Sequence, residues 1–363
     1  MFYVQYLSSN IFSKIGGNIT LARNIDYYLT HSFPYIKSLL IYPQDTVNDG
    51  IPFIDIFGLS SVSKLIYLLP FAVRNRKEDP LIHIQSFNID GLLIGLFFKL
   101  IGWKLILHSH GSDLEKWGKN SKIHKYIAKK VFVKADAVFY ASNRLKKIGN
   151  KIFRSSKGEY IPNFVHPSFS SQIFNSKIVY NPRSINLVFT GRIEIEKGII
   201  DLIEAMKLIK DSLFKNVFKI HLIGTGTGLK RADNLVKKYE LGTNIVFHGK
   251  MSQKMIIEIY KVSNFIILPS HSEALPISIL EGMVSGLPII STKVGELSKI
   301  VKESGAGILI NKINSPSEIF KTLINIQKIN TQQYNQMRTK TIMYGKKYSS
   351  EHFFNILTHK KLI

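Results

Sequence analysis

Two carboxylates and the helix start between them form the stretch with the clearest capacity for chemistry. Glu273 lies in a polar loop, and Glu281 follows it after seven intervening residues. Pro276 is typical of a helix start, and the unpaired amides of the first turn, at Ile277 and Ser278, would attract an anion such as a phosphate. The two glutamates could then accept hydrogen bonds from hydroxyl groups on either side of that anion. A nucleotide sugar has hydroxyl groups of this kind on both sides of its phosphates.

Apolar segments predict the elements that position these groups. The apolar run 265–268 predicts a buried strand that ends in the polar loop. The following helix has one apolar side, formed by Leu280, Met283, Val284 and Leu287. Glu281 lies off this side and can face a ligand near the carboxyl end of the strand, where ligands of parallel sheets bind. The alternative is that Glu273 and Glu281 are two solvated surface acids.

The spacing of these residues resembles a family signature. Glu-x7-Glu, with Leu-Pro after the first acid and Gly-x-Pro after the second, is similar to the motif of the retaining GT-B glycosyltransferases of group one. The resemblance implies an α/β fold of the GT-B type, with two Rossmann-like, doubly wound domains that face a central cleft. It also implies that Glu273 holds the transferred sugar and that Glu281 holds the ribose of the nucleotide. Ala274 replaces the glycine that usually follows the first acid, although its peptide N–H remains.

Two cations, Arg192 and Lys197, follow an earlier candidate strand, 186–190. A guanidinium fork and a lysine point charge both suit a diphosphate, although single cations of this kind are usually ordinary surface residues. Their Gly-Arg-x4-Lys-Gly spacing resembles the diphosphate clamp of the group-one family. The resemblance therefore implies that Arg192 and Lys197 bind the donor diphosphate.

A Gly-x-Gly-x-Gly turn begins at Gly224, after the predicted strand 218–223. A dinucleotide-binding dehydrogenase would need Gly-x-Gly-x-x-Gly and an acid about 20 residues later; that spacing is absent, and no such acid stands out. The turn is similar instead to one that group-one enzymes place near the donor nucleotide. Lys250, at the end of the next strand, matches a position beside the base. Lys299 departs from the family, which has an acid in this place.

The N-terminal half carries weaker matches to the same family. Gly16 and Gly17 follow the first predicted strand and match a glycine-rich loop that faces the donor phosphate; a plain tight turn is the alternative. His110 follows the predicted strand 104–107 and matches the histidine of a His-Gly-x-Asp stretch, which faces the donor sugar. A metal site that includes His108 is less favoured, because His-x-His alternates between the faces of a strand and no third ligand is evident.

The domain organisation is predicted from the same matches. Ile161-Pro162-Asn163 resembles the junction near the end of the first domain, but Phe164 and His166 replace its glycine and aspartate. We predict an N-terminal acceptor-binding domain over 1–166, a linker over 167–184, a C-terminal nucleotide-sugar-binding domain over 185–343 and a last helix, within 344–363, that crosses back to the first domain.

Length and composition agree with two folded domains. The chain has 363 residues, of which 45% are hydrophobic and 11% aromatic, which excludes a disordered chain. It contains no cysteine, which excludes disulfides and cysteine metal sites. The first residues lack the features of a signal peptide, and the longest apolar stretch, 91–107, is interrupted by Lys99 and Lys104. We therefore expect a cytoplasmic chain.

The formal net charge of +24 indicates a partner of opposite sign. From Lys116 to Lys157 there are thirteen basic residues and one acid, Asp136. Within this stretch, 119–133 predicts a helix with Lys122, Lys125, Lys129 and Lys130 on overlapping turns and Ile123, Tyr126, Ile127 and Val131 opposite. Residues 116–157 thus favour an anionic membrane surface or a lipid-diphosphate acceptor; a solvated helix face is the alternative. Nucleic acid would also attract this charge, but no nucleic-acid-binding motif accompanies it, so we expect no such partner.

The expected chemistry needs no metal and no other cofactor, since the sequence contains no Asp-x-Asp pair. Charge on the leaving diphosphate would be met by Arg192, Lys197 and the helix start. The resemblance implies a retaining glycosyltransferase that uses a UDP- or GDP-linked sugar, oriented by Glu273 and His110, and a glycan or lipid-linked acceptor. Bacterial surface polysaccharide synthesis (lipopolysaccharide, O-antigen or capsule) is the expected setting. A GT-B sugar-nucleotide epimerase and a catalytically silent nucleotide-sugar-binding protein remain alternatives.

Overall fold

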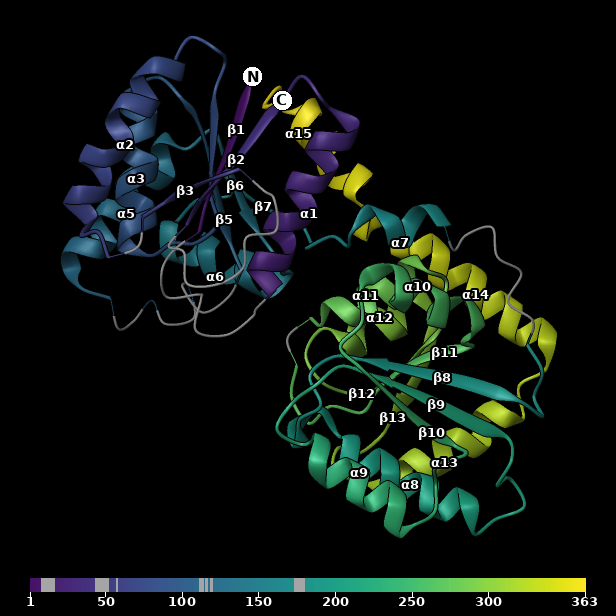
Figure 1. Cartoon of the computed structure of the whole chain (residues 1–363). Helices are drawn as coiled ribbons and strands as arrows, with labels where there is room; N and C mark the ends of the chain where they lie inside the picture. Colours follow the sequence, from purple (N-terminus) through teal and green to yellow (C-terminus); the bar gives the residue numbers. More distant parts are fainter. Residues whose placement is uncertain are drawn as a thin grey trace. The chain divides into compact units, whose positions relative to one another are not determined.

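The chain folds as two compact α/β units in the computed structural model (Figure 1). Unit 1 comprises Met1–Phe164 and Ser350–Ile363, and unit 2 comprises Val165–Ser349. The structure describes residues 1–7, 17–42, 52–56, 58–110, 114, 117, 120–172, 180–273 and 275–363. Each unit is built around a parallel sheet, as the alternation of apolar strands and helices predicts.

Within the described ranges, unit 1 has a seven-stranded parallel sheet in the order β3-β2-β1-β4-β5-β6-β7. The strands are β1 Phe2–Tyr6, β2 Lys37–Tyr42, β3 Phe53–Asp55, β4 Leu81–Ile84, β5 Lys104–Ser109, β6 Ala137–Tyr140 and β7 Gly158–Tyr160. Val4 of β1 pairs with Leu39 on one side and with Ile82 on the other. The strand order therefore reverses between β1 and β4.

Helices cover both faces of this sheet. They are α1 Gly17–Ser32, α2 Ser61–Asn75, α3 Ile89–Leu100, α5 Lys122–Lys134, α6 Asn143–Phe153 and α15 Ser350–His359. Val4 and Tyr6 belong to a core with α2, α3 and α5, whereas Tyr3 belongs to a core with α1 and α15 (Figure 1). Successive side chains of a strand point to opposite faces of the sheet, so β1 is buried on both faces.

In its described part, unit 2 has a six-stranded parallel sheet in the order β10-β9-β8-β11-β12-β13. The strands are β8 Ile185–Thr190, β9 Phe218–Ile223, β10 Ile245–Gly249, β11 Phe265–Leu268, β12 Ile289–Thr292 and β13 Gly307–Ile310. The helices are α7 Pro167–Gln172, α8 Ile199–Lys210, α9 Leu229–Lys238, α10 Gln253–Val262, α11 Ile277–Val284, α12 Leu297–Ser304, α13 Pro316–Gln327 and α14 Thr331–Gly345, with short 3₁₀ helices η3 Ile195–Lys197 and η4 Lys346–Tyr348. Figure 1 shows α8, α9 and α13 on one side of the sheet and α10, α11, α12 and α14 on the other.

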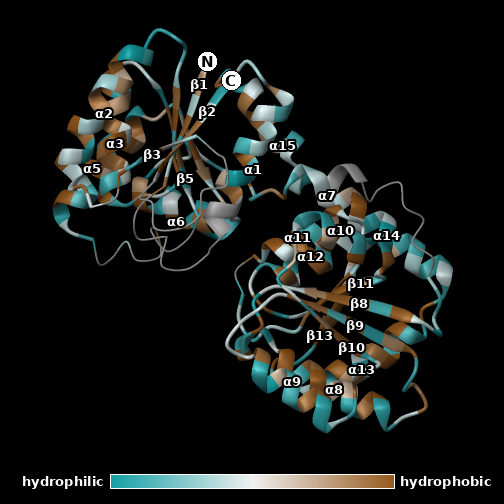
Figure 2. Cartoon of the chain, viewed as in Figure 1, coloured by the Kyte–Doolittle hydropathy of each residue, from teal (hydrophilic) through white to brown (hydrophobic). Residues whose placement is uncertain are grey.

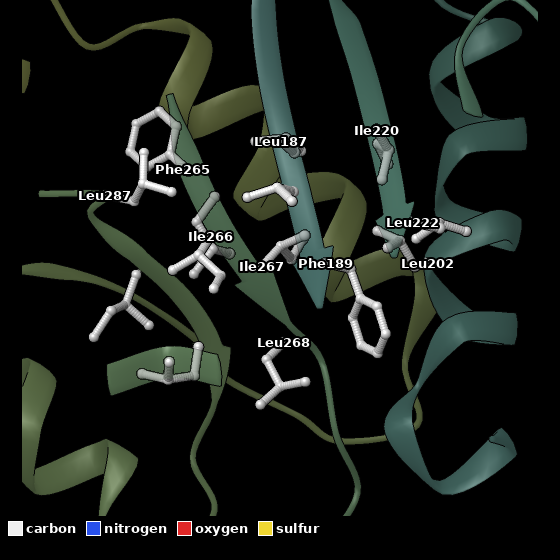
Figure 3. Close-up of a cluster of buried hydrophobic side chains, with 14 of the residues drawn as sticks. Leu187, Phe189, Leu202, Ile220, Leu222, Phe265, Ile266, Ile267, Leu268 and Leu287 are labelled. Carbon is white, nitrogen blue, oxygen red and sulfur yellow. The ribbon is translucent and has the colours of Figure 1, made fainter. Parts of the chain in front are cut away.

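The strands of unit 2 form a dense apolar core, brown in Figure 2. β11 is buried along its whole length, with Leu187 and Leu222 of neighbouring strands in the same cluster (Figure 3). The predicted apolar side of α11 is confirmed, since Leu280, Met283, Val284 and Leu287 are all buried. Burial of a side chain of this size contributes roughly 1.5–3 kcal/mol. The loop between β11 and α11 therefore begins and ends at firmly packed elements.

The predicted linker 167–184 is not irregular throughout. Its first part is helix α7, whose Phe169 is buried with its ring centroid 5.7 Å from that of Tyr260 in α10. The buried ring of Phe169 holds this short helix in place, and residues 167–172 belong to unit 2. Residues 173–179 lie outside the described ranges.

The predicted last helix over 344–363 is divided into separate elements. α14 ends at Gly345, η4 follows, and α15 begins at Ser350 as part of unit 1. Phe353 of α15 packs against Phe164, with ring centroids 4.8 Å apart, so this departure from the family pattern fills the core of unit 1. His166, the second departure, is buried and its Nδ1 lies 2.7 Å from the hydroxyl of Ser168. None of the helices described is long and apolar enough to cross a membrane.

Candidate functional site

The candidate site of unit 2 lies where its strand order reverses. β8 and β11 are neighbours in the sheet, although the chain passes from β8 outward to β10 before it returns to β11. Ligands of such sheets bind outside the carboxyl ends of the strands at this reversal. Arg192 and Lys197 follow β8, and Glu273 follows β11. The residues predicted to hold the diphosphate and the sugar are thus on the two loops at this reversal.

Lys197 and Glu273 form an ion pair across these two loops. The Lys197 ammonium group donates to Oε1 of Glu273, and the Ser270 hydroxyl donates to the same oxygen at 3.2 Å. Both charged side chains are mostly buried, with exposed fractions of 17% and 12%. The sequence predicted that each residue holds a different part of one ligand; the structure brings the two into direct contact.

The loop that carries Glu273 is fixed by contacts that the sequence analysis missed. The backbone N–H of His271 donates to the carbonyl oxygen of Glu196 at 2.9 Å. The Nε2 of His271 lies 2.6 Å from Oδ2 of Asp201, in the first turn of α8, and an ionised carboxylate makes this nitrogen the donor. An acid in the first turn is common at helix starts, so nothing in the sequence marked Asp201 as part of the site.

Two glycines let the strand-end loops approach each other at the level of the backbone. Gly198 has a φ of 72°, and a Cβ on it would lie 2.0 Å from the carbonyl oxygen of Pro269. Gly224 has a φ of 134°, and its Cβ would lie 1.8 Å from the carbonyl oxygen of Gly191. Side chains at these positions would push the loops apart. The sequence predicted Gly224 as a nucleotide contact, and the structure shows a second reason for glycine there.

The other predicted donor-binding residues make fewer contacts. Arg192 donates from Nη1 to Oε1 of Glu194 at 2.5 Å, within its own loop, and its side chain is 55% exposed. Lys250 is exposed directly after β10. Gly17 is the first residue of α1, and Gly16 lies outside the described residues. Among the members of this set that the structure describes, Lys197 and Glu273 are the pair joined by a direct side-chain contact.

Glu281 lies in α11, one turn after the helix begins at Ile277. Pro276, predicted at the position of the first helical residue, is instead the N-cap residue directly before Ile277, and it makes no side-chain cap bond. Burial raises the pKa of Glu281 to about 8, so its carboxyl group is mostly protonated at neutral pH. Burial, and then the charge of Glu281, raise the pKa of Tyr260, whose hydroxyl donates to Oγ1 of Thr190 at the end of β8 (3.1 Å). Glu281 is therefore close to the strand reversal.

His110 belongs to unit 1, at the end of a row of three imidazoles. Its ring centroid lies 4.1 Å from that of His108, which stacks on His83 at 5.4 Å. Burial lowers the pKa of His110 to about 4, that of His83 to about 3 and that of His108 well below its ordinary value. His110 is therefore neutral at pH 7, and any contact it makes to a ligand would be a hydrogen bond of a neutral imidazole. Its Nδ1 lies 3.2 Å from Oδ1 of Asn163, which gives the predicted junction a contact with this histidine.

Two further predictions concern metals and Lys299. Within the described ranges, no group of three or more His, Asp or Glu side chains is arranged to hold a metal ion. Lys299 forms an ion pair with Glu303 at 3.7 Å, with both side chains about half exposed. This contact lies within α12, and the structure does not explain why lysine replaces the acid here.

Residues 172–348 match the family described as glycosyl transferases group 1. The matched segment contains both strand-end loops and α11, and so all the candidate residues of unit 2.

Curated relatives align with about a third to two thirds or more of the chain at low identity. An uncharacterized glycosyltransferase of Methanocaldococcus jannaschii is 28% identical over 247 residues, which are 68% of this chain and 65% of that protein. A second from the same organism is 32% identical over 133 residues, 36% of this chain and 33% of that protein. The chain thus spans less than two thirds of the length of either. An uncharacterized 41.2 kDa protein in the cps region of Klebsiella pneumoniae is 23% identical over 70% of this chain and 71% of its own.

Solved structures share the fold over nearly the whole chain. A glycosyltransferase from Rickettsia africae has a TM-score of 0.73 at 16% identity, covering 99% of this chain and 98% of that one. Anabaena HepE in complex with UDP-glucose has a TM-score of 0.65 at 16% identity, covering 99% and 100%. The lipopolysaccharide outer core galactosyltransferase WaaB has a TM-score of 0.63 at 17% identity, covering 98% and 100%. These likenesses confirm the predicted GT-B fold. The match of residues 172–348 supports membership of the group-one family.

Proposed function

We propose that the chain is a retaining, metal-independent glycosyltransferase that moves a sugar, of the hexosyl class, from a nucleotide-sugar donor to a glycan or lipid-linked acceptor. The observation that carries this proposal is the ion pair of Lys197 and Glu273 at the strand reversal of unit 2, four residues before α11. HepE, whose structure is described as a complex with UDP-glucose, supports a nucleotide-sugar donor. UDP- and GDP-linked sugars are both candidates.

In this proposal unit 2 binds the donor. Lys197, Arg192 and the first-turn amides at Ile277 and Ser278 bind the diphosphate, because two cations and the positive end of the helix dipole favour an anion there. Arg192 reaches it by leaving Glu194, its partner within the same loop. Glu281 accepts hydrogen bonds from the ribose, and Gly224 and Lys250 lie toward the nucleotide.

The proposed transfer breaks the bond between the anomeric carbon and the diphosphate oxygen. A bond from the anomeric carbon to the acceptor oxygen forms on the same face of the sugar, and the acceptor proton ends on the leaving nucleoside diphosphate. Lys197 and Arg192 stabilise the charge that grows on that diphosphate, which is electrostatic catalysis by preorganised groups. Glu273 orients the sugar, and neutral His110 remains a predicted contact to the same group.

The proposed setting is bacterial surface polysaccharide synthesis on the inner face of the plasma membrane, by a cytoplasmic and peripherally bound enzyme. Two similar proteins support it by their descriptions, the lipopolysaccharide galactosyltransferase WaaB and the protein in the cps region of K. pneumoniae. The basic stretch 116–157 supplies the charge for an anionic membrane surface.

The test begins with a calorimetric and thermal-shift screen of UDP- and GDP-linked sugars, in which a donor at 100 times its Kd adds about 2.7 kcal/mol of stability. The donor that binds is then incubated with oligosaccharide and polyprenyl-linked acceptors, and NMR reads the anomeric configuration of the product. A product of retained configuration supports the proposal, and an inverted product contradicts it. Conversion of the donor without an acceptor would identify an epimerase, and binding without release of nucleotide in every mixture would identify a silent binding protein.

A further inference from the structure

Helix α2 of unit 1 presents a continuous apolar stripe to solvent. The stripe consists of Val62, Ile66, Leu69 and Val73, at i, i+4, i+7 and i+11, with exposed fractions of 66%, 68%, 44% and 41%. Leu68 and Ala72, on the other side of the helix, are buried in the core. Hydrophobic residues therefore run along both sides of α2 (Figure 2), whereas a helix that faces water normally carries polar residues on its outer side.

Helix α5 exposes a second apolar set among lysines. Ile123, Tyr126 and Val133 are 72%, 62% and 74% exposed. The sequence placed Ile123 and Tyr126 with Val131 on one apolar side, but the structure buries Ala128, Val131 and Phe132 and leaves the other two outside. The cause is that the buried three occupy the side of α5 that packs against α3. The outer side also carries Lys122, Lys129, Lys130 and Lys134.

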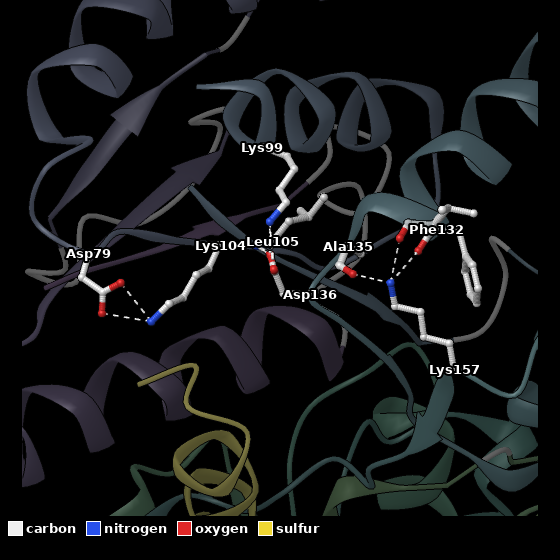
Figure 4. Close-up of polar contacts among 9 residues, drawn as sticks. Asp79, Lys99, Lys104, Leu105, Phe132, Ala135, Asp136 and Lys157 are labelled. Carbon is white, nitrogen blue, oxygen red and sulfur yellow. Dashed lines mark hydrogen bonds and ion pairs between the residues drawn. The ribbon is translucent and has the colours of Figure 1, made fainter. Parts of the chain in front are cut away.

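The one acid of the basic stretch does not neutralise these lysines. Asp136 accepts hydrogen bonds from the Lys99 ammonium group and from the backbone N–H of Leu105, each at 2.7 Å (Figure 4). The ammonium group of Lys157 faces the protein and not the solvent. It donates to backbone carbonyls at the C-terminal end of α5, including that of Val133 at 2.9 Å. Lys157 is therefore a structural cation. Exposed basic residues of this region lie on α5 and, as Lys147 and Lys151, on α6.

These two surfaces lie on the same face of one unit. α3 packs against both α2 and α5, and Figure 1 shows the three helices as one layer on the sheet of unit 1. Apolar side chains beside lysines suit an anionic bilayer, where the apolar groups enter the interface and the cations pair with lipid phosphates. A second copy of the chain in a two-fold contact would instead bring Arg74, Arg76 and Lys77, at the end of α2, and the lysines of α5 against like charges.

We infer that the α2 stripe and the outer side of α5 together form the face by which unit 1 docks on an anionic lipid bilayer. The inference rests on the membrane partner of the proposed function and deepens it in two ways. It adds α2, a helix outside the basic stretch, and it makes the contact partly apolar. The face can then hold the chain on a membrane at salt concentrations that screen a purely electrostatic contact.

The test is co-sedimentation of the full chain with vesicles of phosphatidylcholine alone and of phosphatidylcholine mixed with phosphatidylglycerol. We expect binding to the anionic vesicles, with Lys129→Glu lowering the partition coefficient about fivefold or more and Ile66→Glu about tenfold. The matched controls are Lys254→Glu and Leu213→Glu, two exposed positions of unit 2, and they should bind like the wild type. Circular dichroism melting checks that each variant is folded.

Several results would overturn the inference. Wild-type binding by folded Ile66→Glu would remove α2 from the face, and an Ile66-dependent dimer without vesicle binding would assign the stripe to a second copy. Titration with UDP- and GDP-linked sugars, run in parallel, separates this inference from the proposed function. A chain that binds a donor but no vesicle refutes the docking face alone, and one that binds vesicles but no donor refutes the donor site alone.

Discussion

If Glu281 binds the ribose as proposed, its raised pKa makes donor binding depend on pH. A carboxylate can accept hydrogen bonds from both ribose hydroxyls, but burial raises the pKa of Glu281 to about 8, so the group must lose a proton when the donor binds. At pH 7 this ionisation costs about 1.4 kcal/mol, a factor of about ten in affinity. Affinity should therefore rise about tenfold per pH unit up to the pKa and become constant above it, where the carboxylate is already present.

The perturbation is Glu281→Gln, which keeps the shape of the side chain and removes its titration. The variant should show a donor Kd that is independent of pH. At high pH it should bind about ten- to a hundredfold more weakly than the wild type, because a charge-assisted hydrogen bond contributes about 1.5–3 kcal/mol. Glu258→Gln, an exposed acid of α10 that pairs with Lys261, is the matched control and should follow the wild type.

The assay is calorimetric titration with the nucleotide sugar chosen by the screen, between about pH 6 and pH 9, in pairs of buffers with different heats of ionisation. The difference in heat between buffers counts the protons released on binding, and the diphosphate of the donor keeps a constant charge over this range. Wild-type protein should release close to one proton at pH 7. A pH-independent affinity for the wild type, or uptake of a proton, would refute the role of Glu281 as a carboxylate that binds the ribose.

Three further predictions concern charge, loop position and acid stability. Lys197→Ala should lower kcat by about 10²–10³. Its effect should not add to that of Glu273→Ala, because either change leaves a mostly buried charge unpaired. A double-mutant cycle on kcat/KM measures this coupling. Asp201→Asn should weaken the anchor of His271 and lower kcat about tenfold with a smaller change in donor Kd, whereas an equal loss in both would assign Asp201 to donor binding. The buried histidines of unit 1 stay neutral in the folded chain, so below the ordinary pKa of 6.5 the unfolded chain binds more protons. The free energy of unfolding should therefore fall by about 1.4 kcal/mol per pH unit for each such histidine as the pH falls. His110→Gln should reduce this slope, measured by urea unfolding.

Much of the fold was predictable because parallel strands buried on both faces appear as continuous apolar runs. β11 and the apolar side of α11 were read directly from residues 265–287, and both are buried as predicted. The first part of the linker was missed because its helix is held by one buried ring, that of Phe169, within an otherwise polar segment. Periodicity needs several turns to be visible, and α7 has only six residues.

The two loops that carry the candidate site residues were predictable from the sequence, but the contact between them was not. Spacing placed Lys197 and Glu273 on separate loops, and only the strand order of unit 2 decides that these loops are neighbours. The Asp201–His271 contact depends on the same neighbourhood, since 70 residues separate the two in sequence. Short-range patterns carry no information about such pairs, whereas the glycines at 198 and 224 do carry some, because only glycine permits the close approach of these backbones.

The Lys197–Glu273 contact changes how the predicted roles of these residues should be understood. A diphosphate that binds to Lys197 competes with a carboxylate already in contact with the ammonium group, so the donor must supply a better partner for both. Phosphate oxygens can replace the carboxylate at Lys197, and sugar hydroxyls can then donate to the released carboxylate of Glu273. A nucleoside diphosphate without a sugar offers only the first exchange and leaves Glu273 without its partner. Under the proposed function we therefore expect tighter binding of the intact nucleotide sugar than of the nucleoside diphosphate, which favours binding of substrate and release of product.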